Sequence, residues 1–310
     1  MPEKEFAIGA DIGGTHITCA AVHIRTGEIQ NETLSRVEYR HDDPAENILR
    51  AWAEALNAAI GKTGADRLAG LGFAIPGPFD YRNGISEMKH KFPNLYGLHV
   101  PSGLKPLLKQ GQDLIMRFLN DATSFAVGEA WAGVGRGCKK VVVITLGTGF
   151  GSAFLDEGIP VVTRADVPPE GCLWHLAYRE SIADNYFSAG WFAREYEKRT
   201  GRPAPDVRQL SVLAASDPET RGLFATFGAN LAEFMAPWLA RFDAGILIVG
   251  GNIAQALPLF GEDLRQGLAR AGAAVKTLPS ALLERAALIG SARLLDAAFW
   301  EKASAELPDI

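Results

Sequence analysis

Three glycine-rich turns carry the residues of this sequence that are best suited to hold phosphate groups. The first, Asp11-Ile12-Gly13-Gly14-Thr15, lies between two apolar stretches of strand length. Because glycine has no side chain, the backbone N–H groups of such a turn can approach a phosphate closely. Thr15 adds a hydroxyl donor, and the Asp11 carboxylate could hold a water molecule on a magnesium ion. Taken alone, the same residues also fit a plain tight turn.

Two further turns have a similar design. Leu146-Gly147-Thr148-Gly149-Phe150-Gly151 again lies between apolar stretches, so strands are expected on both sides of it. A Walker loop or a dinucleotide-binding loop leads into a helix instead, and this turn is neither. Gly250-Gly251-Asn252 follows the apolar stretch 244–249 and could admit an adenine ring against bare backbone. The alternative for this third turn is the start of a helix.

The elements that must position these turns repeat along the chain. Residues 6–29 and 141–162 share one plan: an apolar strand, a glycine-rich hairpin, a strand, an acidic-glycine turn and a third strand. We interpret this as an internal duplication about 135 residues apart, which predicts two halves that face each other across a cleft. After the first copy, Asp43 and Pro44 predict a helix start, with Asp43 as the cap and Pro44 as the first helical residue.

The composition is that of an ordinary globular protein. The 310 residues predict two domains or lobes, and the formal net charge of −5 argues against a nucleic-acid-binding surface. Cys19, Cys138 and Cys172 are too widely spaced for a disulfide framework. The sequence lacks an apolar run that could cross a bilayer and lacks the pattern of a secretory signal. We therefore expect a cytoplasmic protein with no nucleic-acid or membrane partner.

Together the three turns resemble the two phosphate motifs and the adenosine motif of the actin–hexokinase–Hsp70 superfamily. Within it, the chain resembles the ROK family of repressors, open-reading-frame proteins and sugar kinases, over about residues 6–298. The further matches are Ile75-Pro76-Gly77-Pro78, Pro93-Asn94-Leu95, Leu119-Asn120-Asp121-Ala122 with Gly128-Glu129, and Ala287-Leu288-Ile289-Gly290-Ser291-Ala292. The resemblance implies an α/β, two-lobed, ribonuclease H-like fold with a duplicated βββαβα core. Residues 1–118, joined by a C-terminal helix over 292–310, would form the small lobe, and residues 119–291 the large one.

The resemblance also implies a function. The chain would be an ATP- and Mg²⁺-dependent sugar kinase that phosphorylates a hexose hydroxyl. The preferred expectation is the 6-hydroxyl of a glucose-like sugar. Asp11 would act on Mg²⁺ through water. The ATP-binding residues would be Asp11, Gly13, Gly14, Thr15, Gly147, Thr148, Gly149, Gly250, Gly251 and Asn252. A homodimer is expected from the family alone.

Asp121 is the expected catalytic base. It lies between the predicted strand 114–119 and a predicted helix that begins at Ala122. N–H groups at a helix N-terminus favour an ionised carboxylate, which can accept a proton from a sugar hydroxyl as its oxygen attacks the γ-phosphate. The family places its base at this Asp of the Asn-Asp pair; the alternative is that the pair only caps the helix. The other groups expected to fix the sugar here are the Gly77 backbone, Asn94 and Asn120.

The stretch after the second turn departs from the family pattern. Typical members carry Gly-Glu-x-Gly-His, then a zinc motif of one His and three Cys, then a second Glu that binds the sugar. Here Glu170 and His175 are five residues apart instead of three, and Cys172 stands alone nearby. We therefore expect no structural zinc. Glu170 and His175 are the expected sugar ligands, and Glu180 or Asp184 is the expected replacement for the second Glu.

Other functions stay open on the sequence. A ROK repressor carries about 70 further N-terminal residues with a helix-turn-helix, and a first motif at residue 11 leaves no room for them. A sugar sensor without catalysis would suit the altered stretch 170–175 but not Asp121. A kinase that uses polyphosphate would not need Gly250-Gly251-Asn252. The sugar could be glucose, mannose, allose, fructose or an N-acetylated amino sugar, because side-chain placement decides between them.

Overall fold

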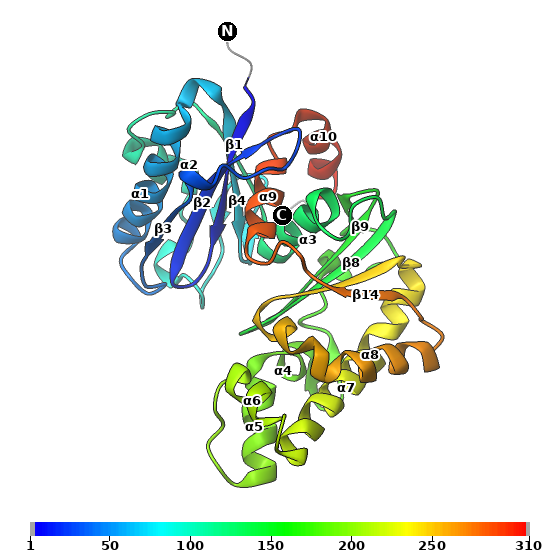
Figure 1. Cartoon of the computed structure of the whole chain (residues 1–310). Helices are drawn as coiled ribbons and strands as arrows, with labels where there is room; N and C mark the ends of the chain where they lie inside the picture. The colour runs from blue at the N-terminus through cyan, green and yellow to red at the C-terminus, as the bar shows by residue number, and fades with distance from the viewer. Residues whose placement is uncertain (1–3, 308–310) are drawn as a thin grey trace. The chain divides into compact units, whose positions relative to one another are not determined.

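The computed structural model describes residues 4–307. Within these residues the chain divides into two compact units (Figure 1): a first unit of residues 4–136 with 284–307, and a second unit of residues 137–283. The boundaries expected from the sequence, after residues 118 and 291, differ from this division. Residues 1–3 and 308–310 of the expected small lobe lie outside the described residues.

The first unit contains a five-stranded sheet, a small hairpin and five helices among its described residues. Its strands are β1 (Phe6–Ile12), β2 (His16–His23), β3 (Ser35–Glu38), β4 (Leu68–Ile75) and β7 (Ile115–Asn120), with the hairpin β5 (Phe79–Asp80) and β6 (Ile85–Ser86). Its helices are α1 (Ala45–Thr63), α2 (Val100–Leu104), α3 (Asp121–Ala132), α9 (Arg285–Arg293) and α10 (Ala297–Ala305). The strand order is β3-β2-β1-β4-β7, in which β1, β4 and β7 run parallel.

Parallel pairing brings the carboxyl ends of three strands to one edge of this sheet. Asp11 pairs with Ala74, and Ile75 pairs with Asn120. The turns that follow β1 and β4, and the helix that follows β7, therefore start at the same edge. Side chains from distant parts of the sequence meet there, as is common for ligand sites of α/β sheets.

Helices cover both faces of the first sheet, with α1 on one face and α9 on the other (Figure 1). The side of α1 that faces the sheet includes the fully buried Ile48, Trp52 and Leu56, at helical spacing. The predicted start of this helix was wrong by one position. Pro44 is the N-cap, and the Asp43 carboxylate instead accepts a hydrogen bond from the Arg40 N–H at 2.9 Å.

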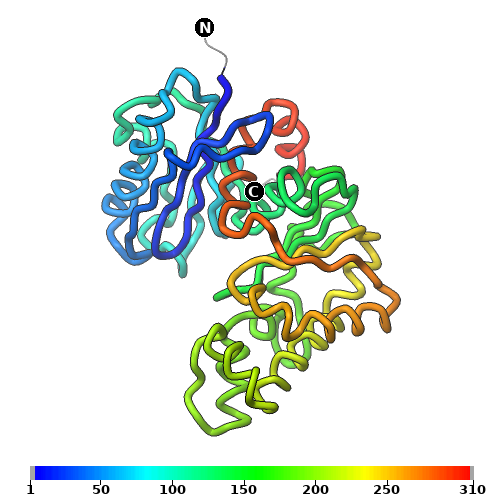
Figure 2. Tube along the Cα trace, viewed as in Figure 1, coloured from blue at the N-terminus to red at the C-terminus, as the bar shows by residue number. Residues whose placement is uncertain are grey.

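Glycines let α9 lie directly on the sheet and on α3. A Cβ at Gly9 would lie 1.9 Å from the Leu288 oxygen, and one at Gly72 would lie 1.9 Å from the Ser291 oxygen. A Cβ at Gly290 would lie 1.7 Å from the Ser124 oxygen of α3. Figure 2 shows this C-terminal segment, coloured orange to red, beside the blue N-terminal strands. This packing explains why the chain returns to the first unit at residue 284.

The second unit has a sheet of the same order. Its strands are β8 (Lys140–Leu146), β9 (Phe150–Asp156), β10 (Ile159–Pro160), β13 (Ile246–Gly250) and β14 (Lys276–Pro279), with the hairpin β11 (Ala177–Tyr178) and β12 (Ser181–Ile182). Its helices are α4 (Ala183–Tyr186), α5 (Ala189–Thr200), α6 (Val207–Leu213), α7 (Pro218–Phe242) and α8 (Leu257–Arg270).

The two sheets confirm the repeated plan that the sequence predicts. The order β10-β9-β8-β13-β14 matches β3-β2-β1-β4-β7 strand for strand, with three antiparallel strands followed by two parallel ones. A core rich in phenylalanine, including Phe187, Phe192, Phe227 and Phe260, joins the second sheet to α5, α7 and α8. Each unit thus has its own hydrophobic core.

Candidate active site

The first glycine turn is a tight hairpin between β1 and β2. The Gly13 N–H donates to the His16 oxygen at 3.0 Å, and the Thr15 hydroxyl lies 3.0 Å from His16 Nδ1. A Cβ at Gly14 would meet nothing within 4 Å, and the φ of this residue is not in the left-handed region. Neither protein packing nor backbone conformation therefore requires glycine at position 14. Close approach of a ligand to the backbone would explain why this residue is glycine.

Asp11 is the last but one residue of β1 and is partly exposed, and its carboxylate is poorly solvated. Burial first, and then the negative charges of Asp121 and Glu284, together raise its pKa from 3.8 to about 7. Three carboxyl groups from distant parts of the chain thus influence one another electrostatically in the first unit, although no three such side chains among the described residues are placed to hold a metal ion.

Glu284 has no counterpart among the residues selected from the sequence. It is the N-cap of α9 and is exposed, and it joins this site because α9 lies on β1 and β4. A lone Glu beside an apolar helix gives no local signal of such a role. Only the return of the chain to the first unit places it near Asp11.

Asn120 and Asp121 stand where β7 ends and α3 begins. The Asn120 side chain is the N-cap and accepts the Thr123 N–H at 3.2 Å, while Asp121 Oδ1 accepts the Ala122 N–H at 2.9 Å. Both residues are partly exposed. The capping alternative is thus present for Asn120, and it leaves Asp121 Oδ2 with no recorded protein partner among the described residues.

Gly77 and Asn120 are linked through a residue that the sequence analysis did not select. The Tyr81 hydroxyl donates to the Ile75 oxygen at 3.2 Å and accepts from Asn120 Nδ2 at 3.3 Å. A Cβ at Gly77 would lie 3.2 Å from the same hydroxyl, and the Gly77–Pro78 peptide bond is cis. Tyr81 therefore orients the Asn120 amide next to the turn that follows β4.

Asn94 lies in an exposed 3-10 turn, Pro93–Leu95. Its amide nitrogen donates to the backbone oxygens of Asp42 and Asp43, at 2.9 and 3.0 Å. These contacts join two loops of the first unit and do not involve Asn120 or Asp121. The structure thus gives Asn94 a structural partner and leaves its predicted contact with the sugar as a prediction.

The second and third glycine turns lie together in the second unit. The Gly147 N–H donates to the Gly149 oxygen at 3.0 Å, which closes the hairpin between β8 and β9, and Thr148 is exposed at its tip. Gly251 has a φ of 81°, and a Cβ there would lie 2.3 Å from the Leu146 oxygen. The turn of Gly250, Gly251 and the exposed Asn252 therefore packs against the strand that leads into the hairpin.

Asp184 supports the second hairpin. Its Oδ1 accepts the Phe150 N–H at 2.7 Å and would lie 3.2 Å from a Cβ at Gly149. The Ala189 N–H, at the start of α5, donates to the Gly147 oxygen at 2.8 Å. Asp184 thus positions the hairpin, and its place as the alternative to Glu180 for the second sugar-binding Glu stays a prediction.

The remaining sugar-ligand candidates lie on the segment between β10 and α4. Glu170 is exposed with a φ of 57°, and His175 is partly buried with its ring 5.2 Å from that of Trp174. Glu180 is exposed and accepts the Tyr186 hydroxyl at 2.8 Å, which lowers its pKa. The structure records no contact between Glu170 or His175 and the two glycine turns of this unit.

The ROK family model matches residues 7–298 of the chain. The chain belongs to the ROK family. It is 24% identical to a glucokinase of Thermotoga maritima over 325 residues, which covers 95% of this chain and 98% of the relative. The match confirms the family resemblance that the glycine turns and the Asn120–Asp121 pair indicated.

Solved structures of ROK proteins share the fold. The ROK hexokinase from Thermus thermophilus has a TM-score of 0.79 at 23% identity, with 96% of this chain and 99% of that chain covered. A ROK family glucokinase from Streptomyces griseus, solved in complex with glucose and AMPPNP, has a TM-score of 0.73 at 23% identity, with 93% and 98% covered. These likenesses confirm the predicted α/β, actin/hexokinase-like fold class.

The zinc motif is the main departure of this ROK chain. Over the described residues 4–307, no group of three or more His, Cys, Asp or Glu side chains is placed to hold a metal ion. Cys172 Sγ donates instead to the Glu170 oxygen at 3.4 Å, and the Ser152 hydroxyl ties this segment to β9 by contacts with Gly171 and Leu173. Protein hydrogen bonds therefore anchor this segment.

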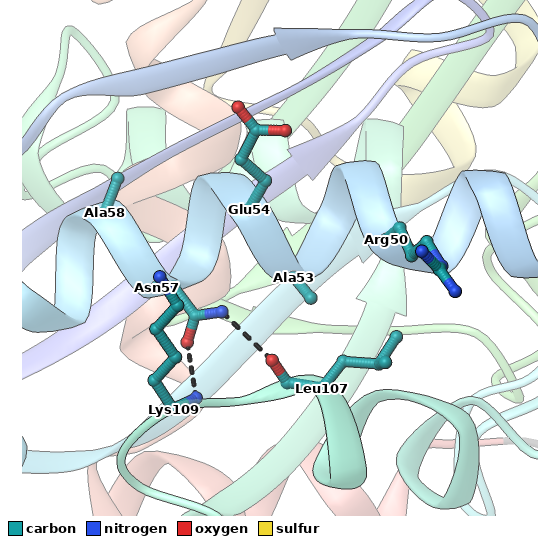
Figure 3. A pocket seen from close by; sticks show the side chains of 7 residues that line it. All are labelled: Arg50, Ala53, Glu54, Asn57, Ala58, Leu107 and Lys109. Carbon is teal, nitrogen blue, oxygen red and sulfur yellow. Dashed lines mark hydrogen bonds between the residues drawn. The ribbon is translucent and has the colours of Figure 1, made fainter.

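A surface groove of this ROK chain lies apart from the motif residues. It measures about 670 Å³ and runs between α1 and the segment that follows α2 (Figure 3). Its lining residues are Arg50, Ala53, Glu54, Asn57, Ala58, Leu107 and Lys109. The Asn57 amide closes one side through bonds to the Leu107 oxygen and the Lys109 N–H. None of these is a predicted site residue.

The helices among the described residues are too short or too polar to span a membrane.

Proposed function

We propose that this ROK protein is a sugar kinase that transfers the γ-phosphate of ATP to a hexose hydroxyl, the 6-hydroxyl of a glucose-like sugar. The observation that carries the proposal is the pair of carboxyl groups at one edge of the first sheet. Asp121 begins a helix there, close enough to Asp11 for its charge to raise the pKa of Asp11. A base and a cation-binding carboxylate side by side are what phosphoryl transfer to a hydroxyl requires.

Asp121 is the proposed general base. It would accept the proton of the sugar hydroxyl while the oxygen attacks phosphorus. The N–H groups of the first turn of α3 favour the ionised form that can accept this proton. Because Asp121 is the first residue of α3 and one of its oxygens already binds the Ala122 N–H, the carboxylate has little freedom to rotate. This placement supports a fixed base more than a mobile surface carboxylate.

The nucleotide would be held by the glycine turns. In the proposal, the phosphate-binding residues are Gly13, Gly14 and Thr15 of the first hairpin and Gly147, Thr148 and Gly149 of the second. Gly250, Gly251 and Asn252 would contact the adenosine. Open space above Gly14 and Gly147 supports these contacts, because a Cβ at either residue would meet no protein atom within 4 Å.

In the proposal, Asp11 would hold a magnesium ion through water, and Glu284 adds negative charge near Asp11. When bound, the ion would neutralise charge on the phosphates. The sugar would be fixed by Asn120, Gly77 and Asn94 and by Glu170 and His175, and the identity of these last two positions would set which hexose is accepted.

The test is ADP release from Mg-ATP with a panel of free hexoses and N-acetylhexosamines. The wild-type chain should turn over one or a few of them. Asp121→Asn keeps the shape and the cap but cannot accept the proton, so kcat should fall by at least about a hundredfold. Asp113→Asn, at an exposed position, is the matched control and should keep the wild-type rate.

Two results would contradict this function. Equal loss in both variants would show that Asp121 is no base. No turnover with any sugar would contradict the proposed kinase activity. Sugar binding without ATP hydrolysis would then favour a sensor.

A further inference from the structure

One buried tyrosine, Tyr39, forms two hydrogen bonds with the first glycine hairpin. The Tyr39 hydroxyl donates to the Gly13 oxygen at 2.5 Å, and the Tyr39 N–H donates to the Thr15 oxygen at 2.9 Å. The two acceptor oxygens belong to Gly13 and Thr15, the residues on either side of Gly14. Tyr39 directly follows β3, the edge strand that pairs with β2, so the contact joins the hairpin to this neighbouring strand.

The Gly13 carbonyl and the Gly14 N–H belong to one peptide group. A trans peptide is planar, with its C=O and N–H pointing in opposite directions. A hydroxyl that fixes the Gly13 oxygen therefore also fixes the direction of the Gly14 N–H, away from Tyr39. Among the described residues the Gly14 N–H has no protein acceptor. A phosphate oxygen could therefore accept it.

The Tyr39 ring is itself held rigidly. It packs against Trp52 at 6.3 Å and Phe92 at 6.2 Å between ring centroids, and both partners are fully buried. Burial raises the pKa of the Tyr39 phenol, so the hydroxyl stays protonated and remains a donor at neutral pH. Three aromatic rings from three segments therefore position one hydrogen-bond donor under the hairpin.

We propose that Tyr39 is a positioning residue for the phosphoryl donor, because its hydroxyl holds the Gly13–Gly14 peptide with the Gly14 N–H directed at a phosphate of ATP. The proposal rests on the proposed function, in which this hairpin binds the nucleotide. Tyr39 touches neither substrate; it acts through the hairpin. Without its hydroxyl the peptide can rotate, and the phosphate contact is lost for part of the time.

The experiment compares Tyr39→Phe with Tyr196→Phe. Both remove one hydroxyl and keep the ring, and Tyr196 is buried on α5 in the core of the second unit. The KM for Mg-ATP should rise about tenfold in Tyr39→Phe, which corresponds to about 1.4 kcal/mol. Its kcat and its KM for the sugar should stay within about twofold of wild type. Tyr196→Phe should leave all three constants within about twofold.

Two readouts do not depend on turnover. Mg-ATP should raise the Tm of the wild-type chain and of Tyr196→Phe, and should raise that of Tyr39→Phe less at the same concentration. Amide hydrogen exchange in residues 12–16 should be faster in Tyr39→Phe than in wild type without nucleotide. Gly14→Ala is the positive control, because its methyl group meets only the ligand and should weaken Mg-ATP binding without loss of stability.

The outcomes separate this proposal from the kinase function. If the wild-type chain binds Mg-ATP but phosphorylates no sugar, the kinase fails, and the Tm and exchange data still decide the role of Tyr39. Unchanged Mg-ATP binding in Tyr39→Phe would overturn the proposal, as would equal changes in the KM values for Mg-ATP and for sugar. A wild-type chain that does not bind Mg-ATP would overturn both.

Discussion

At the scale of single residues, Asp11 shows how tertiary structure changes the chemistry of an ordinary side chain. Its pKa lies near 7 because burial, Asp121 and Glu284 all disfavour the charged form. In the unfolded chain the same carboxyl group would titrate near 3.8. Between these values the folded state binds a proton that the unfolded state has released, so folding stability must fall as pH rises from about 4 through about 7.

This sign can be tested with Asp11→Asn in EDTA. Asparagine cannot ionise, so the variant should be more stable than wild type, and its gain in Tm should be larger at pH 8 than at pH 5. Asp42→Asn is the control. A hydrogen bond from Arg40 lowers the pKa of Asp42 to about 2, so its effect should be the same at both pH values. A gain for Asp11→Asn that does not grow with pH would contradict the shifted pKa.

At the scale of elements, the close packing of α9 depends on glycines that look alike in the sequence. Gly290 in α9 and Gly61 in α1 are both helical glycines, and each would be expected to weaken its helix relative to alanine. Their surroundings differ. A Cβ at Gly290 would lie 1.7 Å from the Ser124 oxygen, whereas one at Gly61 would meet nothing within 4 Å.

Alanine at these two positions should therefore have opposite effects on the free energy of unfolding. Gly290→Ala forces α9 away from α3 and should destabilise the chain by about 3 kcal/mol. Gly61→Ala should stabilise it by up to about 1 kcal/mol. Urea unfolding midpoints of the two variants give the comparison. A Gly290→Ala chain as stable as wild type would mean that the two helices are not in direct backbone contact.

At the scale of the whole molecule, the last segment of the chain belongs to the unit in which the chain begins. Helix α9 is buried along residues 286–292, and Leu294 and Leu295 after it are buried as well. Arg117 lies 4.5 Å from the ring centroid of Trp300, which fixes α10 to the same unit. The second unit needs none of these residues for its own core. The expected homodimer stays a prediction.

A chain that ends at Leu283 should therefore lose the first unit and keep the second. It lacks Leu288, Ile289, Leu294 and Leu295, whose burial contributes about 6–12 kcal/mol, comparable with the stability of a whole domain. Limited proteolysis with mass spectrometry should show rapid cleavage before residue 137 and protection of 137–283. A chain that ends at residue 295 keeps α9 and is the control. Equal protection of both regions would show that α9 is dispensable.

The sequence by itself determined what local chemistry can specify. Glycine at positions 13, 14, 147, 149 and 251 marks the turns, and the apolar stretches before them predict the strands. The repeated plan of these strands predicted two sheets of one design, and the sheets have that design. The Asn120–Asp121 pair could be placed between a strand and a helix, because capping is a local interaction.

Only the tertiary structure decided which of these residues meet. Glu284 joins Asp11, and the Tyr39 hydroxyl binds Gly13, through contacts between residues far apart in the sequence. No period or motif encodes such a contact, because it depends on how α9 packs on the sheet and how β3 pairs with β2. Asp43 shows the same limit at short range: its carboxylate binds the Arg40 N–H instead of capping α1. Local patterns fix the elements, whereas the close approach of distant backbones fixes the site.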